Sequence, residues 1–205
     1  MQTLRNLFAA ARTRLAARPD TEHEQAIVRL VIGVLLGLYL LPEILDRHAE
    51  GLPEPHVLVW IGFLAFSTAI FGAILVSPRA SPARRVFGTV LDAATLSWCI
   101  AHFEELGIPL FLVYLWFTYG NGFRYGARYL VVSLVLSMFG FATVLSLSGF
   151  WQARLNMGIW MMIGFVALSL YVLTLVRRMF DALARAEAAN LAKRRFVSVV
   201  SHELG

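Results

Sequence analysis

The sequence predicts an all-α polytopic membrane protein with six transmembrane helices, both termini in the cytoplasm, and a coiled-coil dimerisation helix after the last span. Hydrophobic residues make up 59% of the 205-residue chain and charged residues 15%. A soluble domain has about 45–50% apolar and about 25% charged residues. The apolar residues here lie in long blocks separated by short polar breaks. A helix of about 20 apolar residues spans a hydrocarbon core of roughly 30 Å and satisfies its own backbone hydrogen bonds there.

The segment before the first apolar block, residues 1–25, is rich in arginine. Its leucines recur at helical spacing, which predicts a basic amphipathic helix on the inner leaflet; a solvated helix end is the alternative. We expect no cleavable signal peptide, because the segment lacks a continuous apolar core. Asp20, Thr21 and Glu22 resemble a helix start, in which a capping residue is followed by acids in the first turn.

Six apolar blocks follow within residues 26–176 and predict a six-helix transmembrane domain. The fourth block is the shortest, and Pro109 suits the first turn of its helix, where a missing N–H costs little. The predicted spans are residues 27–45, 57–76, 86–103, 108–123, 130–149 and 155–176.

The basic residues predict the orientation of these spans. With the N-terminus in the cytoplasm, only Arg47 and Arg154 of the 18 lysines and arginines fall on the outer side. Inner loops of membrane proteins carry the excess of Lys and Arg, so both termini are predicted to be cytoplasmic. This placement also explains the net charge of +5 without a nucleic-acid partner. The outer loops are short, so a ligand would be met in the membrane or at its outer face.

The tail, residues 177–205, has no proline and no glycine before its last residue and is rich in helix-forming residues. Two heptad series predict a parallel homodimeric coiled coil, in which Asn190 and Lys193 are the polar seam residues that specify register. A chance repeat on a solvated helix is the alternative. The two series are Leu183, Asn190, Val197 and Leu204, and Met179, Ala186, Lys193 and Val200.

His202 lies off this seam and is expected to face solvent. Glu203 follows it and could accept a proton from one ring nitrogen, which would make the other a better nucleophile. The stretch FVSVVSHEL resembles the H-box of histidine kinases. The resemblance implies that His202 is the phosphoacceptor and Glu203 its base helper. Gly205 stands where that family has arginine, which we interpret as a truncation point or tag junction.

The chain also resembles the membrane sensor of the diffusible-signal-factor kinases, the Rpf-type hybrid sensor histidine kinases. Matching stretches are PDTEHEQAIVRL before the first span, Arg84 and Arg85 before the third, and GNGFRYGARYL at 120–130. The resemblance implies a fatty-acid quorum-sensing signal, a cis-2-unsaturated acid, and a role for Asp20, Thr21 and Glu22 in the response. It implies ATP and Mg in the parent kinase and an attached receiver domain. It implies no cofactor in this part. The family is often drawn with five spans and an outside N-terminus, which the arginine distribution opposes.

Asp92 lies near the middle of the third predicted span. A carboxylate there costs at least about 2.5–3.5 kcal/mol, so it should face the bundle interior and have a partner. Thr95 and the more distant His102 share its helix. We expect either a polar spot in a signal or proton pathway, or a buried hydrogen bond that joins helices.

The stretch GNGFRYGARY at 120–129 combines glycines, arginines and tyrosines. Its glycines predict a tight turn or a close helix approach, and their density favours a structural switch. Arg124 and Arg128 would lie one turn apart on a helix and could clamp an anionic head group, with Asn121 beside them. The alternative is an ordinary basic inner loop anchored among membrane lipids by tyrosines.

Two other classes of protein fit the sequence less well. A small transporter or channel is the alternative function, but it predicts an internal repeat with broken helices, and we find no convincing repeat. An intramembrane enzyme would need clustered histidines and carboxylates, whereas the histidines are scattered and no HExxH spacing occurs. No metal site is predicted.

Overall fold

The computed structural model describes residues 21–49, 55–77 and 80–203, and every regular element in these ranges is a helix. The predicted all-α class is therefore confirmed for the described part of the chain. The helices are α2 (Glu22–Ala49), α3 (Pro55–Val76), α4 (Pro82–His102), α5 (Glu104–Gly107), α6 (Phe111–Tyr125), α7 (Ala127–Leu147), α8 (Gly149–Gln152) and α9 (Leu155–Glu203). The expected amphipathic helix and Asp20 lie outside the described residues.

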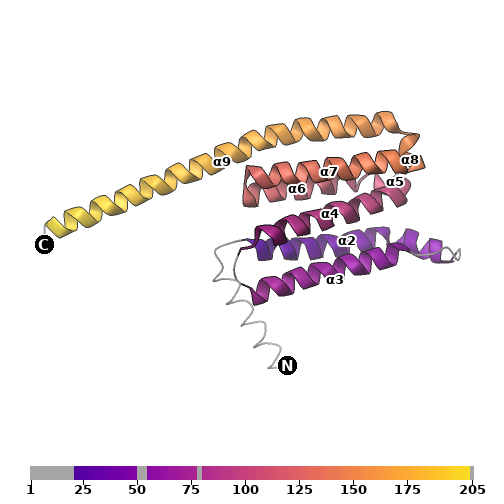
Figure 1. Ribbon diagram of the computed structural model, residues 1–205, viewed down its shortest axis with the longest axis horizontal. Helices are drawn as coiled ribbons and strands as arrows, with labels where there is room; N and C mark the ends of the chain where they lie inside the picture. Colours follow the sequence, from indigo (N-terminus) through magenta and orange to yellow (C-terminus); the bar gives the residue numbers. More distant parts are fainter. Residues whose placement is uncertain (1–20, 50–54, 78–79, 204–205) are drawn as a thin grey trace, which may run out of the picture.

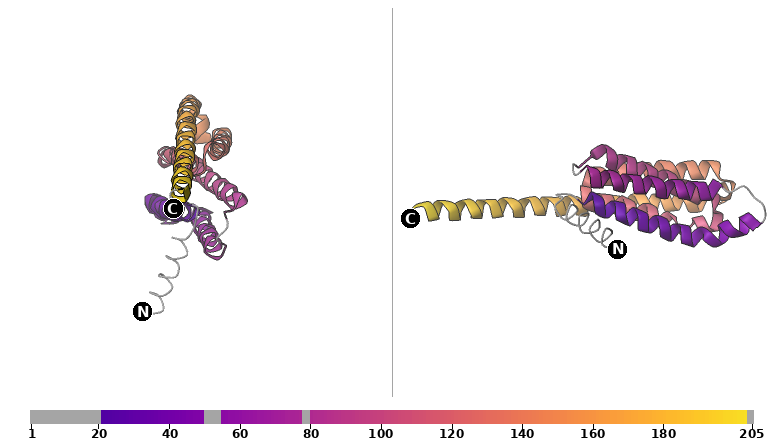
Figure 2. Two further views of the ribbon diagram at one scale, coloured as in Figure 1. Left: turned by 90° about the vertical axis from the view of Figure 1, so that its left-hand side faces the viewer. Right: turned by 90° about the horizontal axis from the view of Figure 1, so that it is seen from below.

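The long helices lie side by side in an up-and-down bundle (Figure 1). The start of α2, the α3–α4 connection and the α6–α7 turn are all at one end, where α9 leaves the bundle; this is the exit end. The end of α2, the start of α3, α5 and α8 lie at the opposite end, the far end. Helix α9 continues from the exit end as a single rod in every view (Figure 2).

Five helical segments are long and apolar enough to cross a membrane, as the composition predicts. They are Glu22–Arg47, Pro55–Val76, Glu104–Tyr125, Ala127–Leu147 and Leu155–Arg195. Helix α4, the third predicted span, is not among them, because its 21 residues include Arg84, Arg85 and Asp92. The structure thus supports five of the six predicted spans, and the crossing by α4 remains a prediction.

The fourth predicted span differs in detail from the structure. The chain forms the short helix α5 and a turn before α6 begins at Phe111. Pro109 therefore lies in the turn that precedes α6, and the prediction that it occupies the first turn of the helix was wrong. Gly107, the last residue of α5, packs so closely on the backbone of Ile100 that a Cβ there would lie 2.8 Å from its carbonyl oxygen.

The largest buried cluster joins residues of α2, α4, α6, α7 and α9 toward the far end. Trp151 of α8 is fully buried in it, and its indole N–H donates to the carbonyl of Ile100 at 3.0 Å. Aromatic rings of α6 and α7 meet edge to face beside it. This core packs α4 against α2 and against the second half of the chain.

Helix α9 runs unbroken through 49 residues from the bundle core to Glu203. At 1.5 Å per residue, this length corresponds to about 73 Å. The prediction of one continuous helix from the last span to His202 is confirmed. The seam residue Leu183 is 54% exposed in the single chain, and its pairing with a second chain remains a prediction.

Candidate functional site

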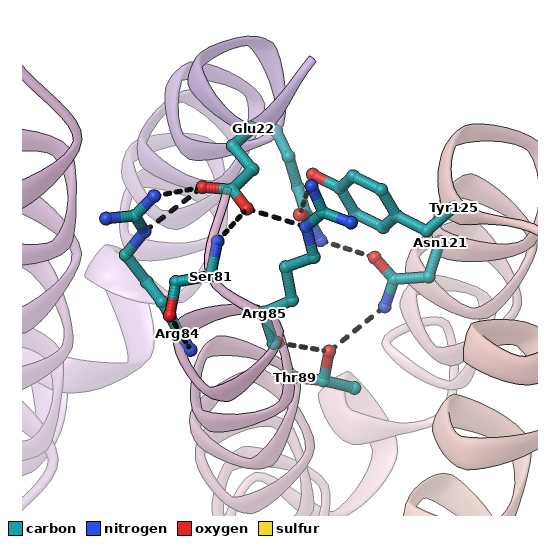
Figure 3. A network of polar contacts seen from close by, with 8 residues as sticks. Glu22, Ser81, Arg84, Arg85, Thr89, Asn121 and Tyr125 are labelled. Carbon is teal, nitrogen blue, oxygen red and sulfur yellow. Dashed lines mark hydrogen bonds and ion pairs between the residues drawn. The ribbon is translucent and has the colours of Figure 1, made fainter. Parts of the chain in front are cut away.

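Glu22 joins the start of α2 to the start of α4 at the exit end. Its side chain is buried, although it belongs to the first turn of a helix. The carboxylate accepts hydrogen bonds from the backbone N–H of Ser81 at 3.0 Å, from the guanidinium of Arg84, and from Arg85 Nε at 2.6 Å (Figure 3). Glu22 is therefore an anchor between two helices as well as a first-turn acid. Thr21 contributes its carbonyl, which accepts from the N–H of Gln25.

Arg85 extends this contact to the second half of the bundle. Its guanidinium lies 4.3 Å from the ring centroid of Tyr125 in α6 and 5.7 Å from that of Tyr129 in α7. A guanidinium over a tyrosine ring is attracted by the negative face of the ring. Tyr125 and Tyr129, which were expected to anchor an inner loop, thus both contact Arg85 of α4. The carboxylate of Glu22 binds the same guanidinium.

Asn121 is the centre of a buried hydrogen-bond network. Its amide nitrogen donates to Ser133 Oγ at 2.8 Å and to Thr89 Oγ1 at 3.2 Å, and its carbonyl accepts from the side chain of Gln25. Gln25 in turn accepts from the hydroxyl of Tyr125 at 2.7 Å. One amide therefore connects α2, α4, α6 and α7; Figure 3 shows its bond to Thr89 of α4. Fully bonded buried networks of this kind favour one packing over others.

Asp92 has the partner that its position predicted, and the partner is Arg29 of α2. The two side chains form a two-point ion pair with distances of 2.6 and 2.9 Å, and both are largely buried. Gly88 makes the pair possible, because a Cβ there would lie 2.9 Å from the guanidinium carbon of Arg29. Sequence reasoning missed Arg29 because it counted this residue among the inner basic residues. The position of Arg29 inside an apolar block could have indicated that it needs a buried partner.

The prediction that Arg124 and Arg128 lie one turn apart on the same helix was wrong. Helix α6 ends at Tyr125 and α7 begins at Ala127, so the two arginines lie on different helices. Gly126 between them has a φ of 91°, a conformation that residues with a Cβ rarely adopt. Arg124 is half-buried and faces the bundle, whereas Arg128 is exposed.

His102 lies at the far end of the bundle and takes no part in the network around Asp92. Its ring stacks on Trp98 with the centroids 3.9 Å apart and meets the ring of His56 edge to face at 5.6 Å. Its Nδ1 is 2.9 Å from the carbonyl of Trp98. Thr95 lines the same side of α4 as Asp92 and does not reach His102 in any described contact.

A groove runs along the bundle from the exit end to the far end between α2, α3, α4 and α6. It encloses about 970 Å³, part of which is open to the surroundings. Its charged side chains and its two amides lie toward the exit end, and the rest of the wall is mostly apolar, with Thr95 on α4 and His56 at the far end as polar exceptions. The charged residues and amides are Gln25, Arg29, Asp92, Asn121 and Arg124. The residues that line the far end of the groove include Ile44, His56 and Phe103.

The exit end is also where the bundle contacts α9 on its way out. Val172 and Val176 of α9 pack on Leu130 of α7, and the ring of Phe180 lies 3.8 Å from where a Cβ of Gly126 would be. The α6–α7 turn, which belongs to the same network as Asn121 and Tyr125, thus touches the last turns of α9 inside the bundle.

His202 and Glu203 lie in the last turn of α9, at the tip of the rod and far from the bundle (Figure 1). Their predicted exposure concerns side chains outside the described part. The structure therefore places the candidate residues in two groups. The ligand and switch candidates Glu22, Asn121 and Arg124 lie at the exit end and Asp92 lies halfway along α4, and α9 separates all four from the predicted phosphoacceptor.

Comparison with known proteins supports the resemblance seen in the sequence. Over 190 residues the chain is 34% identical to the sensory/regulatory protein RpfC from two strains of Xanthomonas campestris pv. campestris. The aligned part is 93% of this chain and 26% of RpfC, so the chain spans about a quarter of the length of these relatives. No protein-family model and no solved structure matches the chain. Together with the apolar helices, this similarity identifies the chain as an RpfC-like membrane sensor region.

Proposed function

We propose that this chain is the signal-sensing membrane module of a bacterial sensor histidine kinase. It crosses the inner membrane six times with both termini in the cytoplasm, responds to a fatty-acid quorum-sensing signal, and transmits the response to the phosphoacceptor His202. The observation that carries the proposal is the unbroken helix α9, which runs from the bundle core to the H-box.

The six-span topology is supported by the way α4 neutralises its charges. Arg84 and Arg85 bind Glu22, and Asp92 binds Arg29, so none of these charges of α4 faces lipid alone. A paired charge inside a bundle is far less costly than an isolated one. Helix α4 also lies parallel to its neighbours along the full bundle (Figure 2). We therefore infer that α4 crosses the membrane with the other five helices.

The fatty-acid signal fits a module without an outer domain. The connections at the far end are short, whereas the groove offers an apolar path inside the bundle. A ligand that binds one packing of the bundle more tightly than another shifts the populations of the two. The polar network at the exit end would differ between the two packings of the bundle, because it joins four helices through a few hydrogen bonds.

Transmission to His202 then needs no further domain. The network touches α9 through the α6–α7 turn and Phe180, and a rigid helix carries a rotation or shift along its axis. Two chains would pair through the heptad seam. In the whole protein, which is longer than this chain, an ATP- and Mg-binding domain would phosphorylate His202, and a receiver domain would follow.

Insertions into α9 test the proposal in the full-length kinase. Adding one, two, three or four alanines after Ala188 should change the phosphorylation of His202 with the period of a helix, because each residue rotates the distal part by about 100°. Inserting a full heptad of seven residues is the matched control and should preserve the seam and the response. Phosphorylation that stays the same for all insertion lengths would contradict the proposal.

A further inference from the structure

We propose that one stripe of α9 has two successive occupants: the chain's own α6 and α7 inside the bundle, and the α9 of a second copy of this chain beyond the exit end. The two occupants meet at Met179 and compete for the turn of helix around it. The proposal rests on the proposed function, in which two chains pair, and adds where the pairing begins and what limits it.

Four buried residues of α9 define the stripe, which faces the bundle and is called the α9 stripe. They are Phe165, Ser169, Val172 and Val176, at alternating spacings of four and three. The same spacings continue beyond the bundle without a skip. The residues that they reach are Met179, Leu183, Ala186 and Asn190. An α-helix has 3.6 residues per turn, so Phe165 and Leu183, five turns apart, point in the same direction from α9.

Burial along the α9 stripe changes abruptly where the bundle ends. Val176 is fully buried, whereas Met179 is 41% exposed and Leu183 54% exposed. Every residue from 181 to 195 is exposed. The chain's own bundle therefore stops covering the stripe between Val176 and Met179.

The part of the stripe inside the bundle is shaped for α6 and α7. A Cβ on Gly158, seven residues before Phe165, would collide with the side chain of Leu145 in α7. The hydroxyl of Ser169 donates to the hydroxyl of Tyr119 in α6 at 3.5 Å. Packed helices lie about 8–10 Å apart between their axes, and α6 and α7 already occupy this space. A second copy's α9 therefore cannot reach this part of the stripe while the bundle is closed.

The part beyond the exit end suits an identical helix. Arg177 and Arg178 precede it, and arginines mark the end of a span on the inner side, so its occupant is met in water and not among lipid tails. Exposed apolar side chains at Met179 and Leu183 are followed by Asn190. One polar seam residue in a parallel two-stranded coiled coil costs stability but specifies the register. In a symmetric dimer the same stripe on both copies forms the contact.

The direction of α9 favours this arrangement. Beyond the exit end the rod slants toward the side of the bundle on which α6 and α7 lie (Figure 1). Seen from its end, the rod crosses in front of the bundle (Figure 2, left). The exposed part of the α9 stripe thus faces the space beyond the α6–α7 turn, where the second copy's rod would lie.

Met179 is accessible to either occupant, because it follows the last buried position of the stripe. A bundle that grips α9 more tightly would shorten the paired seam, and a looser bundle would let the seam extend toward Val176. A signal that shifts the bundle between two packings would thus move the border along the stripe. Pairing of the two chains would change without a bend in α9.

Disulfide cross-linking between copies tests the border in the full-length protein in membrane vesicles. Single cysteines replace stripe residues in a Cys99→Ala background. Leu183→Cys should cross-link rapidly, Val172→Cys should remain at background, and Met179→Cys should lie between them. The rate at Met179→Cys divided by the rate at Leu183→Cys measures the position of the border.

Loosening the bundle should move the border. Leu130→Ala removes the α7 side chain that packs on Val172 and Val176. It should raise the rate ratio about ten-fold, the size expected from the loss of a buried leucine side chain. Val135→Ala is the matched control, because Val135 lies on the same helix and is 59% exposed, and it should leave the ratio unchanged.

Strengthening the paired seam should move the border in the same direction without touching the bundle. Asn190→Ile replaces the polar seam residue by one that favours two-stranded coiled coils and should raise the rate at Met179→Cys relative to Leu183→Cys. Ala188→Ile, off the stripe, is its control. This pair keeps the test decisive even if Leu130→Ala unfolds the bundle.

Two results would overturn the inference. The first is cross-linking of Val172→Cys as fast as that of Leu183→Cys, which would place the second copy's α9 on the stripe inside the bundle. The second is a rate ratio that stays the same in Asn190→Ile as in Ala188→Ile, which would show that the occupants do not compete.

The outcome is separable from that of the insertion experiment. A fixed border together with a periodic insertion response would overturn this inference alone. A border that moves together with a flat insertion response would overturn the proposed function.

Discussion

At the scale of single residues, the exit end depends on a few buried charges whose partners lie far away in the sequence. Glu22 binds α4 across 59 to 63 residues of chain, and Arg29 reaches Asp92 across 63. Each pair joins helices that lie against one another only in the folded bundle. Loss of one partner would leave the other charge poorly compensated, which is the most costly way to break such a contact.

Glu22→Gln should therefore destabilise the bundle by about 1.5–3 kcal/mol, the range for hydrogen bonds to charged groups. The amide cannot neutralise Arg84 and Arg85, which the carboxylate now binds. Thermal unfolding in detergent measures the change. Glu24→Gln is the matched control, because Glu24 belongs to the same first turn and is exposed. Equal melting temperatures for the two variants would show that Glu22 is not an anchor.

Asp92→Leu should cost about 3 kcal/mol or more, because it leaves Arg29 buried without its counter-charge. Adding Arg29→Leu should recover most of that loss, since two apolar side chains can replace a buried ion pair at little cost. A double-mutant cycle on unfolding free energies measures this coupling. Additive losses from the two substitutions would indicate that the ion pair contributes little.

The residue scale also shows what sequence could and could not predict. The position of Asp92 in an apolar block required a partner, and one is present. Its identity could not be predicted, because periodicity within each helix does not say which faces of α2 and α4 meet. Glu22 was assigned a role at its own helix end for the same reason.

At the scale of elements, helix breaks decide which predictions held. Helix α9 has no proline or glycine between Phe165 and Glu203, and its predicted continuity is confirmed. The spacing expected for Arg124 and Arg128 was wrong because helical spacing applies only within one helix, and Gly126 ends α6 between the two arginines. Glycine density in that stretch indicated a turn or a close approach, and both occur, since Gly122 packs against Leu130.

Gly126→Ala should destabilise the α6–α7 turn by about 1–3 kcal/mol. Gly126 has φ 91° and ψ 179°, in a region that is almost restricted to glycine. Gly72→Ala in α3 provides the control, because a Cβ there meets nothing within 4 Å and alanine favours a helix. Unfolding of both variants by heat gives the comparison. A Gly126→Ala protein as stable as Gly72→Ala would exclude the strained turn.

At the scale of the whole molecule, topology depends on α4. The other long helices are apolar enough to span by composition alone, and the charges of α4 are the reason it is not counted with them. If α4 crosses, the α3–α4 connection and α5 lie on opposite sides of the membrane. If it does not, they lie on the same side.

Single-cysteine labelling in intact cells distinguishes the two arrangements in a Cys99→Ser background. A membrane-impermeant maleimide should label Glu105→Cys, on the outer side, and should not label Ser77→Cys, on the inner side. Labelling of Ser77→Cys after permeabilisation confirms that the site is accessible. Similar labelling of both positions in intact cells would mean that α4 does not cross.

The central claim is that the state of the bundle reaches His202 through a continuous paired helix. Disulfide scanning of α9 in the full-length dimer tests it most directly, with single cysteines at positions 181 to 193 in a Cys99→Ala background. We predict cross-linking maxima at Leu183, Ala186 and Asn190 and a change in their relative strength when dodecenoic acid is added. Uniform or absent cross-linking along this stretch, or a pattern that the acid leaves unchanged, would contradict the claim.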